Sequence, residues 1–129
     1  MKLGVFAIAV GLAAGPLPAL AQSEDPAILD RACKRGESMP CANLAVLYKH
    51  GRNVSRDYPK ALTLFVKACE GGVNFACGNV GEMTFRGQGV MANQANGAAL
   101  IKGACRRGDS WSCETARRLG LKMSKKAPA

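Results

Sequence analysis

The chain has 129 residues, with 18 Lys and Arg against nine Asp and Glu, and a formal net charge of +9 at neutral pH. This length predicts one small domain, and the single histidine, His50, excludes a metal centre built from several histidines. The few aromatic residues are not interleaved with the basic ones, which argues against a nucleic-acid surface.

The first 21 residues are typical of a secretory signal peptide. Lys2 supplies the positive start, residues 3–14 are apolar, and Ala19 and Ala21 provide the small residues of a cleavage site. The apolar stretch is shorter than the roughly 20 residues that span a membrane, which favours a signal peptide. The alternative is a retained membrane anchor or a buried first helix. We expect a mature chain that begins at Gln22 and is periplasmic or secreted.

Six cysteines organise the rest of the chain. They stand at positions 33, 41, 69, 77, 105 and 113, so a pair eight residues apart recurs every 36 residues. Other positions keep the same offset, since Asn43 returns as Asn79 and Gly51 as Gly87. A period of about 20 to 50 residues predicts a stacked array in which each unit covers the apolar face of its neighbour.

Two helices are predicted in each period. Leu44, Leu47 and Tyr48 stand at i, i+3 and i+4, and the same spacing returns in residues 61–65. Asp57 and its equivalent Asn93 are suited to cap the second helix of a hairpin. Ahead of these hairpins, an Asp-Pro pair at positions 25 and 26 predicts the start of a first short helix.

Each cysteine pair is expected at a turn between two helices. The first cysteine falls in the last turn of one helix and the second in the first turn of the next, with Gly36, Gly72 or Gly108 ending the earlier helix. In an exported chain this pattern predicts three disulfides, Cys33–Cys41, Cys69–Cys77 and Cys105–Cys113. Zinc is the alternative, but its cysteine ligands stand about two to four residues apart, so we expect no metal and no cofactor.

The sequence resembles the Sel1-like repeat in three motifs. These are the frame A-C-x-x-G with a second cysteine after it, L-A-V-L-Y-K-H-G at 44–51, and D-Y-P-K-A at 57–61. A cysteine pair in each 36-residue unit is similar to the Helicobacter cysteine-rich protein subgroup. The resemblance covers about residues 25–121. It implies an all-α fold, an α/α right-handed superhelix related to tetratricopeptide arrays, in which the first helices of the hairpins line a concave face.

The chain departs from this pattern in two places. Thr84 stands at the position of Tyr48, and Gly97 at that of Ala61, so we expect a looser second hairpin. The third unit stops after one helix. We therefore expect the solenoid in residues 22–122 and a basic, disordered tail in residues 123–129.

Members of the resembled subgroup are often labelled penicillin-binding or β-lactamase-like, which makes a β-lactam hydrolase the alternative function. A serine β-lactamase uses an S-x-x-K motif with supporting S-D-N and K-T-G motifs. None of the three occurs in this sequence, and the acidic residues form no recurrent close pair. We assign no catalytic residue and favour binding of a protein or peptide segment through the concave helical surface.

Candidate binding residues are first-helix positions that point away from the apolar stripe. At the 36-residue offset they form three series: Asn43, Asn79 and Thr115; Val46, Glu82 and Arg118; and His50, Arg86 and Lys122. The two asparagine amides could hold a peptide backbone, or they could bond to the chain's own turns. We interpret the lone histidine as a helix-end residue rather than a catalytic base.

The last helix carries two further features. Trp111 is expected to pack over the Cys105–Cys113 bridge, the alternative being a ligand anchor. Basic residues gather from Arg106 onward, which favours an acidic or envelope-derived partner. The alternative is a solvated basic end that only keeps the protein soluble. We expect a monomer that binds no nucleic acid and does not insert stably into a membrane.

Overall fold

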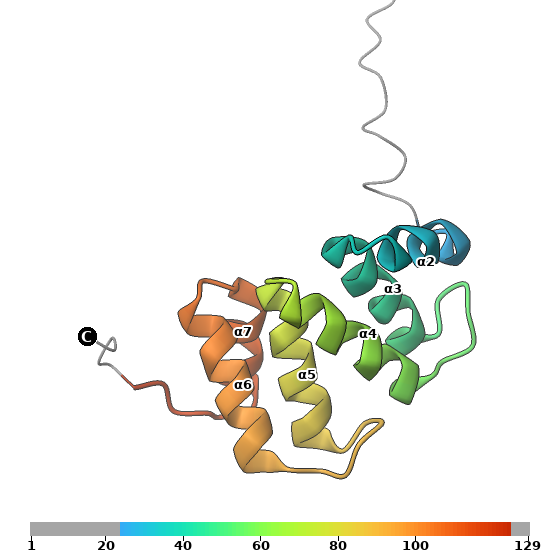
Figure 1. Cartoon of the computed structure of the whole chain (residues 1–129). Helices are drawn as coiled ribbons and strands as arrows, with labels where there is room; N and C mark the ends of the chain where they lie inside the picture. Colours follow the sequence, from blue (N-terminus) through green and yellow to red (C-terminus); the bar gives the residue numbers. More distant parts are fainter. Residues whose placement is uncertain (1–23, 125–129) are drawn as a thin grey trace, which may run out of the picture.

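The computed structural model describes residues 24–124, so the predicted signal peptide and most of the predicted tail lie outside the described residues. Six α-helices make up this part: α2 (Pro26–Lys34), α3 (Ser38–His50), α4 (Tyr58–Glu70), α5 (Asn74–Arg86), α6 (Gln94–Arg106) and α7 (Ser110–Arg118). They stack in chain order, with α2 at one end of the array and α7 at the other (Figure 1). None of these helices is long and apolar enough to cross a membrane.

Local side-chain chemistry sets where several helices begin. Asp25 accepts a hydrogen bond from the backbone N–H of Ala27, and Asp57 and Asn93 accept one from the third residue after them. These three caps are confirmed as predicted. Asp109 caps α7 in the same way, through the backbone N–H of Ser112 at 2.8 Å.

The turns that precede α3, α5 and α7 share one geometry. After α4, Gly72 takes a φ of +93°, a left-handed conformation that side chains other than glycine rarely adopt. Its N–H donates to the carbonyl of Cys69, and the N–H of Val73 donates to that of Ala68. Gly36 and Gly108 have nearly the same φ, so the turn recurs at the predicted period.

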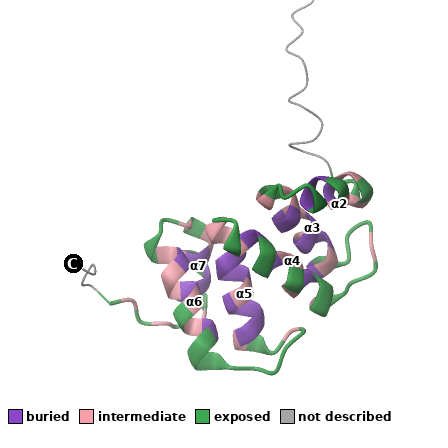
Figure 2. Ribbon diagram, viewed as in Figure 1, coloured by how far each residue is buried: buried purple, intermediate pink, exposed green. Residues whose placement is uncertain are grey.

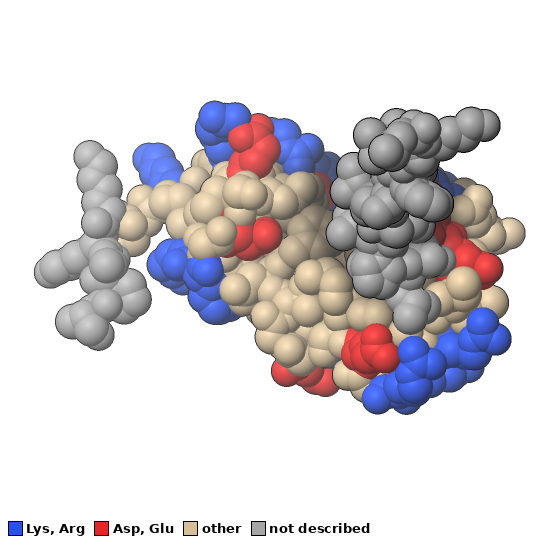
Figure 3. Space-filling view, turned by 90° about the horizontal axis from the view of Figure 1, so that it is seen from above, with Lys and Arg blue, Asp and Glu red and all other residues tan. Residues whose placement is uncertain are grey.

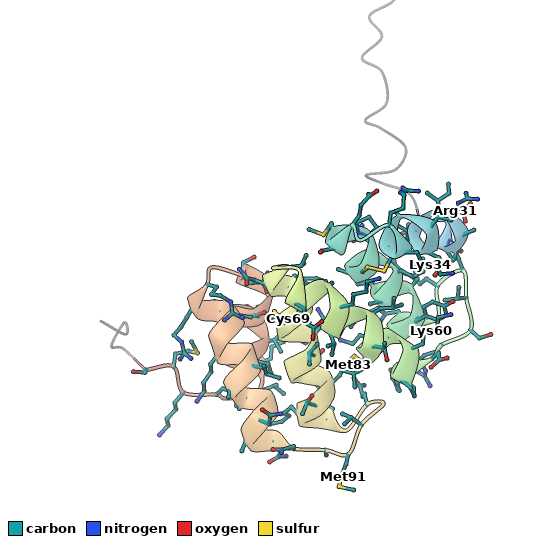
Figure 4. The ribbon with its side chains drawn as sticks, viewed as in Figure 1. Arg31, Lys34, Lys60, Cys69, Met83 and Met91 are labelled. Carbon is teal, nitrogen blue, oxygen red and sulfur yellow. A yellow bond between two sulfur atoms is a disulfide. The ribbon has the colours of Figure 1, made fainter. Side chains whose placement is uncertain are left out.

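All three predicted disulfides are present and span these turns. Their Cα atoms lie 4.6, 4.7 and 4.6 Å apart, within the usual range for a disulfide. They join α2 to α3, α4 to α5 and α6 to α7, as the bridge at Cys69 illustrates (Figure 4). Each described helix therefore has one end tied covalently to a neighbour.

The apolar core lies between the stacked helices. Phe65 of α4 and Met83 of α5 are fully buried, and Leu44 and Leu47 of α3 pack against Leu29 in a second cluster. Buried positions lie on the helix sides that face their neighbours, while the connecting loops are mainly exposed (Figure 2).

The second hairpin corrects an expectation drawn from the sequence. A Cβ at Gly97 would lie 2.5 Å from the backbone nitrogen of Phe85, and one at Gly81 would lie 2.8 Å from the carbonyl oxygen of Gly97. Glycine therefore lets α5 and α6 approach backbone to backbone, and they form the most extensive contact of any helix pair in residues 24–124. The expectation of a looser hairpin was wrong, because the missing methyl group brings the helices closer.

Candidate functional site

A pocket of about 410 Å³ opens between α3, α5 and α7, which are the first helices of successive units. This volume is near the lower end of the range of about 300–1,000 Å³ that holds small ligands or a few side chains. The lining residues are Val46, Lys49 and His50 of α3, Tyr58 of α4, Phe75, Asn79, Glu82 and Arg86 of α5, Gln88 of the following loop, and Trp111 and Arg118 of α7.

The structure brings together six of the nine candidate binding positions that the sequence predicts: Val46, His50, Asn79, Glu82, Arg86 and Arg118. Lys122 lies beyond the end of α7 and is not part of the lining. Asn43 is half-buried on α3 but is not part of the lining. Thr115, on α7, is fully buried and is also outside the lining. Its hydroxyl accepts a hydrogen bond from the Arg118 guanidinium at 2.9 Å, so it positions that arginine.

A buried ion pair forms the centre of the pocket. The Lys49 ammonium donates to Glu82 Oε2 at 2.7 Å, and the two side chains are only 8% and 9% exposed. The same ammonium donates to Asn79 Oδ1 at 2.8 Å and lies 5.4 Å from the centre of the Trp111 ring. The pair joins α3 to α5 and fixes the geometry of the surrounding side chains.

Asn79 serves this ion pair instead of presenting its amide to a ligand. Only 2% of the residue is exposed, and its Nδ2 donates to the backbone carbonyl of Phe75 at 3.0 Å. Its oxygen accepts from Lys49. Both ends of the amide are therefore bonded within the protein, which corresponds to the alternative that the sequence left open for the asparagines.

Positive charge surrounds the Glu82 carboxylate. Burial on its own would raise the pKa of Glu82, but the hydrogen bond and charge of Lys49, together with Arg86, outweigh it and hold the pKa below the ordinary value. Arg86 Nε lies 3.3 Å from Oε1, and a terminal nitrogen of Arg118 lies 4.0 Å from the same oxygen. Three cations thus face one ionised carboxylate, and the pocket has a net positive charge.

His50 lies at the exposed C-terminal end of α3. Its pKa is lowered from 6.5, first by burial and then by the charges of Lys49 and Arg52, with Glu82 acting in the opposite direction. The imidazole is therefore neutral at pH 7, and it does not add to the positive charge of the pocket there.

Two aromatic rings form an apolar wall. The Trp111 and Phe75 ring centres lie 5.2 Å apart in an edge-to-face arrangement. The Trp111 ring also lies near the Lys49 ammonium, and its packing on the Cys105–Cys113 bridge stays a prediction. Trp111 thus lines the pocket.

Sequence reasoning missed Phe75, Lys49, Tyr58 and Gln88 as lining residues. A signal for the first was present, since Met39, Phe75 and Trp111 keep the 36-residue offset one helical turn before the asparagine series. Lys49 has no such signal, because Phe85 stands at its equivalent position.

Comparison with protein families identifies the repeat. The Sel1 repeat model matches residues 41–73 and 74–109, which together are more than half of the chain. The chain belongs to the Sel1 repeat family. Sel1 repeats generally mediate protein–protein interaction.

Solved structures of Sel1 repeat proteins have the same fold. Helicobacter pylori cysteine-rich protein B is 28% identical with a TM-score of 0.62, covering 70% of this chain and 68% of that one. A Sel1 repeat protein from Oxalobacter formigenes is 21% identical with a TM-score of 0.65, covering 71% and 69%. The protective antigen c5321 of uropathogenic Escherichia coli is 25% identical with a TM-score of 0.66, covering 76% of this chain but 22% of the antigen. No curated protein matches the chain.

The pocket does not support the hydrolase alternative. Among the described residues that line it, none is a serine or cysteine that could act as a nucleophile. Within residues 24–124, no group of three or more His, Cys, Asp or Glu side chains is placed to hold a metal ion.

On one face of the molecule, the basic side chains are dispersed. In the view from above, Lys and Arg lie in separate groups at the edges of the surface, with Asp and Glu beside several of them (Figure 3). This face therefore lacks the continuous basic stripe that follows a nucleic-acid backbone.

Proposed function

We propose that this Sel1 repeat protein is exported and binds a segment of another protein in the pocket between α3, α5 and α7. The observation that carries the proposal is the pocket itself. Helices of three successive units build it, and a buried ion pair fixes its centre. Such a site is formed only when the units are stacked, which is how solenoids create binding surfaces that no single repeat has.

Export is supported by the oxidation state of the cysteines. All six form disulfides within the described residues, and disulfides persist mainly in oxidising compartments. The signal-peptide pattern in residues 1–21 agrees with this proposal. We therefore place the mature protein in the periplasm or outside the cell.

The binding proposal is tested by capture from the extracytoplasmic fraction on immobilised, oxidised protein. The pocket variant is Arg118→Glu, and the matched control is Arg106→Glu, which makes the same charge change on α6 outside the pocket. Both arginines are exposed, so both variants should keep the helical circular dichroism spectrum. We expect a partner that binds the wild type and the control but not the pocket variant. A partner retained equally by both variants would show that the pocket is not the binding site.

The hydrolase alternative has a separate test. We expect purified protein to leave a chromogenic cephalosporin intact, because the pocket lining has no serine or cysteine nucleophile. Turnover that follows the protein through every purification step, and that Arg118→Glu abolishes, would replace binding with catalysis as the function of this pocket.

A further inference from the structure

The cations of the pocket have hydrogen-bond donors to spare. A guanidinium has five N–H donors. The structure uses Nε of Arg86 for Glu82, and a terminal nitrogen of Arg118 for Thr115. The two arginine side chains are 44% and 51% exposed, so their other donors are accessible from the pocket mouth. With Lys49 already paired to Glu82, these arginines supply the excess positive charge.

Gln88 contributes an amide group without a full set of hydrogen bonds to the pocket lining. One end of its amide bonds to the Tyr58 hydroxyl at 3.4 Å. The other end, Oε1, is the only buried side-chain nitrogen or oxygen atom in residues 24–124 that has no hydrogen-bond partner. Buried polar atoms are normally bonded, so this oxygen needs a donor from outside the chain, which a water molecule or a peptide N–H supplies.

The polar and apolar parts of the pocket have a definite order in space. The Trp111 ring lies beside the Lys49 ammonium, which bonds to Oε2 of Glu82. Arg86 bonds to the other carboxylate oxygen, Oε1, and Arg118 approaches that same oxygen. Phe75 and Trp111 stand at the N-terminal ends of α5 and α7, and Arg86 and Arg118 stand at the C-terminal ends of the same two helices. A ligand that spans the pocket meets an apolar surface at one end and guanidinium groups at the other.

We propose that the pocket takes a carboxylate of a peptide, either its C-terminal carboxylate or an Asp or Glu side chain, between Arg86 and Arg118. An apolar side chain of the same peptide packs on Trp111 and Phe75, and a peptide N–H donates to Gln88. This inference rests on the proposed function and adds the chemistry of the occupant. Arginine suits the role because its planar fork pairs with both oxygens of a carboxylate.

The chain has a built-in reporter for this test, since Trp111 is its only tryptophan and lines the pocket. Binding is followed by Trp111 fluorescence and by calorimetry on the oxidised protein. The probes are four acetylated peptides with a C-terminal leucine. Two are identical but end in a free acid or an amide, and two are amidated and carry Glu or Gln before the leucine.

The protein variants are Arg86→Gln and Arg118→Gln, with Arg106→Gln as the matched control for loss of one positive charge outside the pocket. We expect at least one carboxylate peptide to bind about tenfold or more tightly than its neutral counterpart, as charge-assisted pairs do. Each pocket variant should weaken that binding by about tenfold, whereas the control should stay within about twofold of the wild type. If the free-acid and amide peptides differ in affinity, the pocket binds the C-terminal carboxylate. If the Glu and Gln peptides differ in affinity, it binds a side-chain carboxylate.

Two results would overturn the inference. If acid and neutral peptides bind equally and the pocket variants behave as the wild type, the two arginines read no carboxylate. The proposed function then survives only if the binding changes the fluorescence of Trp111, which lines the pocket. If no peptide binds while a pocket-dependent partner is still captured, the occupant has a different chemistry. The proposed function itself fails only if that partner is absent as well.

Discussion

Removing one partner of the buried pair of Lys49 and Glu82 should destabilise the protein far more than removing one partner of an exposed pair of similar length. Removing one partner of a buried ion pair typically costs about 3–5 kcal/mol, because the other charge remains buried. For Lys49→Met, Glu82 keeps Arg86 at 3.3 Å, so we expect the low end, about 3 kcal/mol. For Glu82→Gln, the ammonium keeps only Asn79 and the Trp111 ring, and we expect about 4 kcal/mol.

The assay is urea unfolding of the oxidised protein at pH 7, followed by far-ultraviolet circular dichroism. The matched control is Lys34→Met, which breaks a 2.6 Å pair with Asp30 whose side chains are 73% and 38% exposed. That loss should be below about 0.5 kcal/mol. The double variant that combines Lys49→Met with Glu82→Gln should lose much less than the sum of the two single variants. If Lys49→Met is no more destabilising than the control, or if the double variant is additive, the buried pair does not have the role assigned to it.

Three further outcomes follow from other features. Gly97→Ala should destabilise the protein by about 1–3 kcal/mol, because its Cβ would meet backbone atoms. Gly103→Ala, with only a flexible arginine nearby, should stabilise the protein by about 0.5–1 kcal/mol. The urea midpoints of the two variants check both expectations. Replacing Cys69 and Cys77 with alanine should lower the free energy of unfolding by about 2.5 kcal/mol for a nine-residue loop, and an unchanged midpoint would contradict this. The pKa of His50 is lowered from 6.5 in the folded state, so the unfolded chain binds more protons between the folded-state pKa and 6.5. The free energy of unfolding therefore falls as the pH drops through this range. His50→Gln should reduce the loss of stability measured between about pH 7.5 and 5.5.

Much of the fold could be predicted because its determinants are local. Asp57 and Asn93 cap their helices through side chains that reach three residues ahead, and each disulfide joins cysteines on either side of one turn. The 36-residue offset then carried each local inference to the equivalent positions. Membership of the Sel1 repeat family was predictable for the same reason, since the repeat frame is written in neighbouring residues.

The site was only partly predictable, because its chemistry depends on contacts between units. The repeat offset selected Glu82, Arg86 and Arg118, and the structure places all three in the pocket lining, whereas their role in binding stays a prediction. It could not show that Lys49, near the end of a helix, is buried by a carboxylate and a ring from later units. The effect of Gly97 was not predictable for a similar reason. The sequence shows that a methyl group is missing from α6, but it does not show that α5 packs closer to α6 as a result.

The disulfides divide the chain into covalent units that are out of phase with its sequence repeats. The matched repeats run over residues 41–73 and 74–109, whereas the bridges enclose 33–41, 69–77 and 105–113. A protease that nicks one of these rings leaves both products linked until a reductant is added. Cleavage in both of the largely exposed segments, 51–57 and 87–93, divides the chain into α2–α3, α4–α5 and α6–α7, which are then held together by packing alone. Resistance to digestion in a protease-rich compartment therefore depends on those two connections and not on the cross-linked turns.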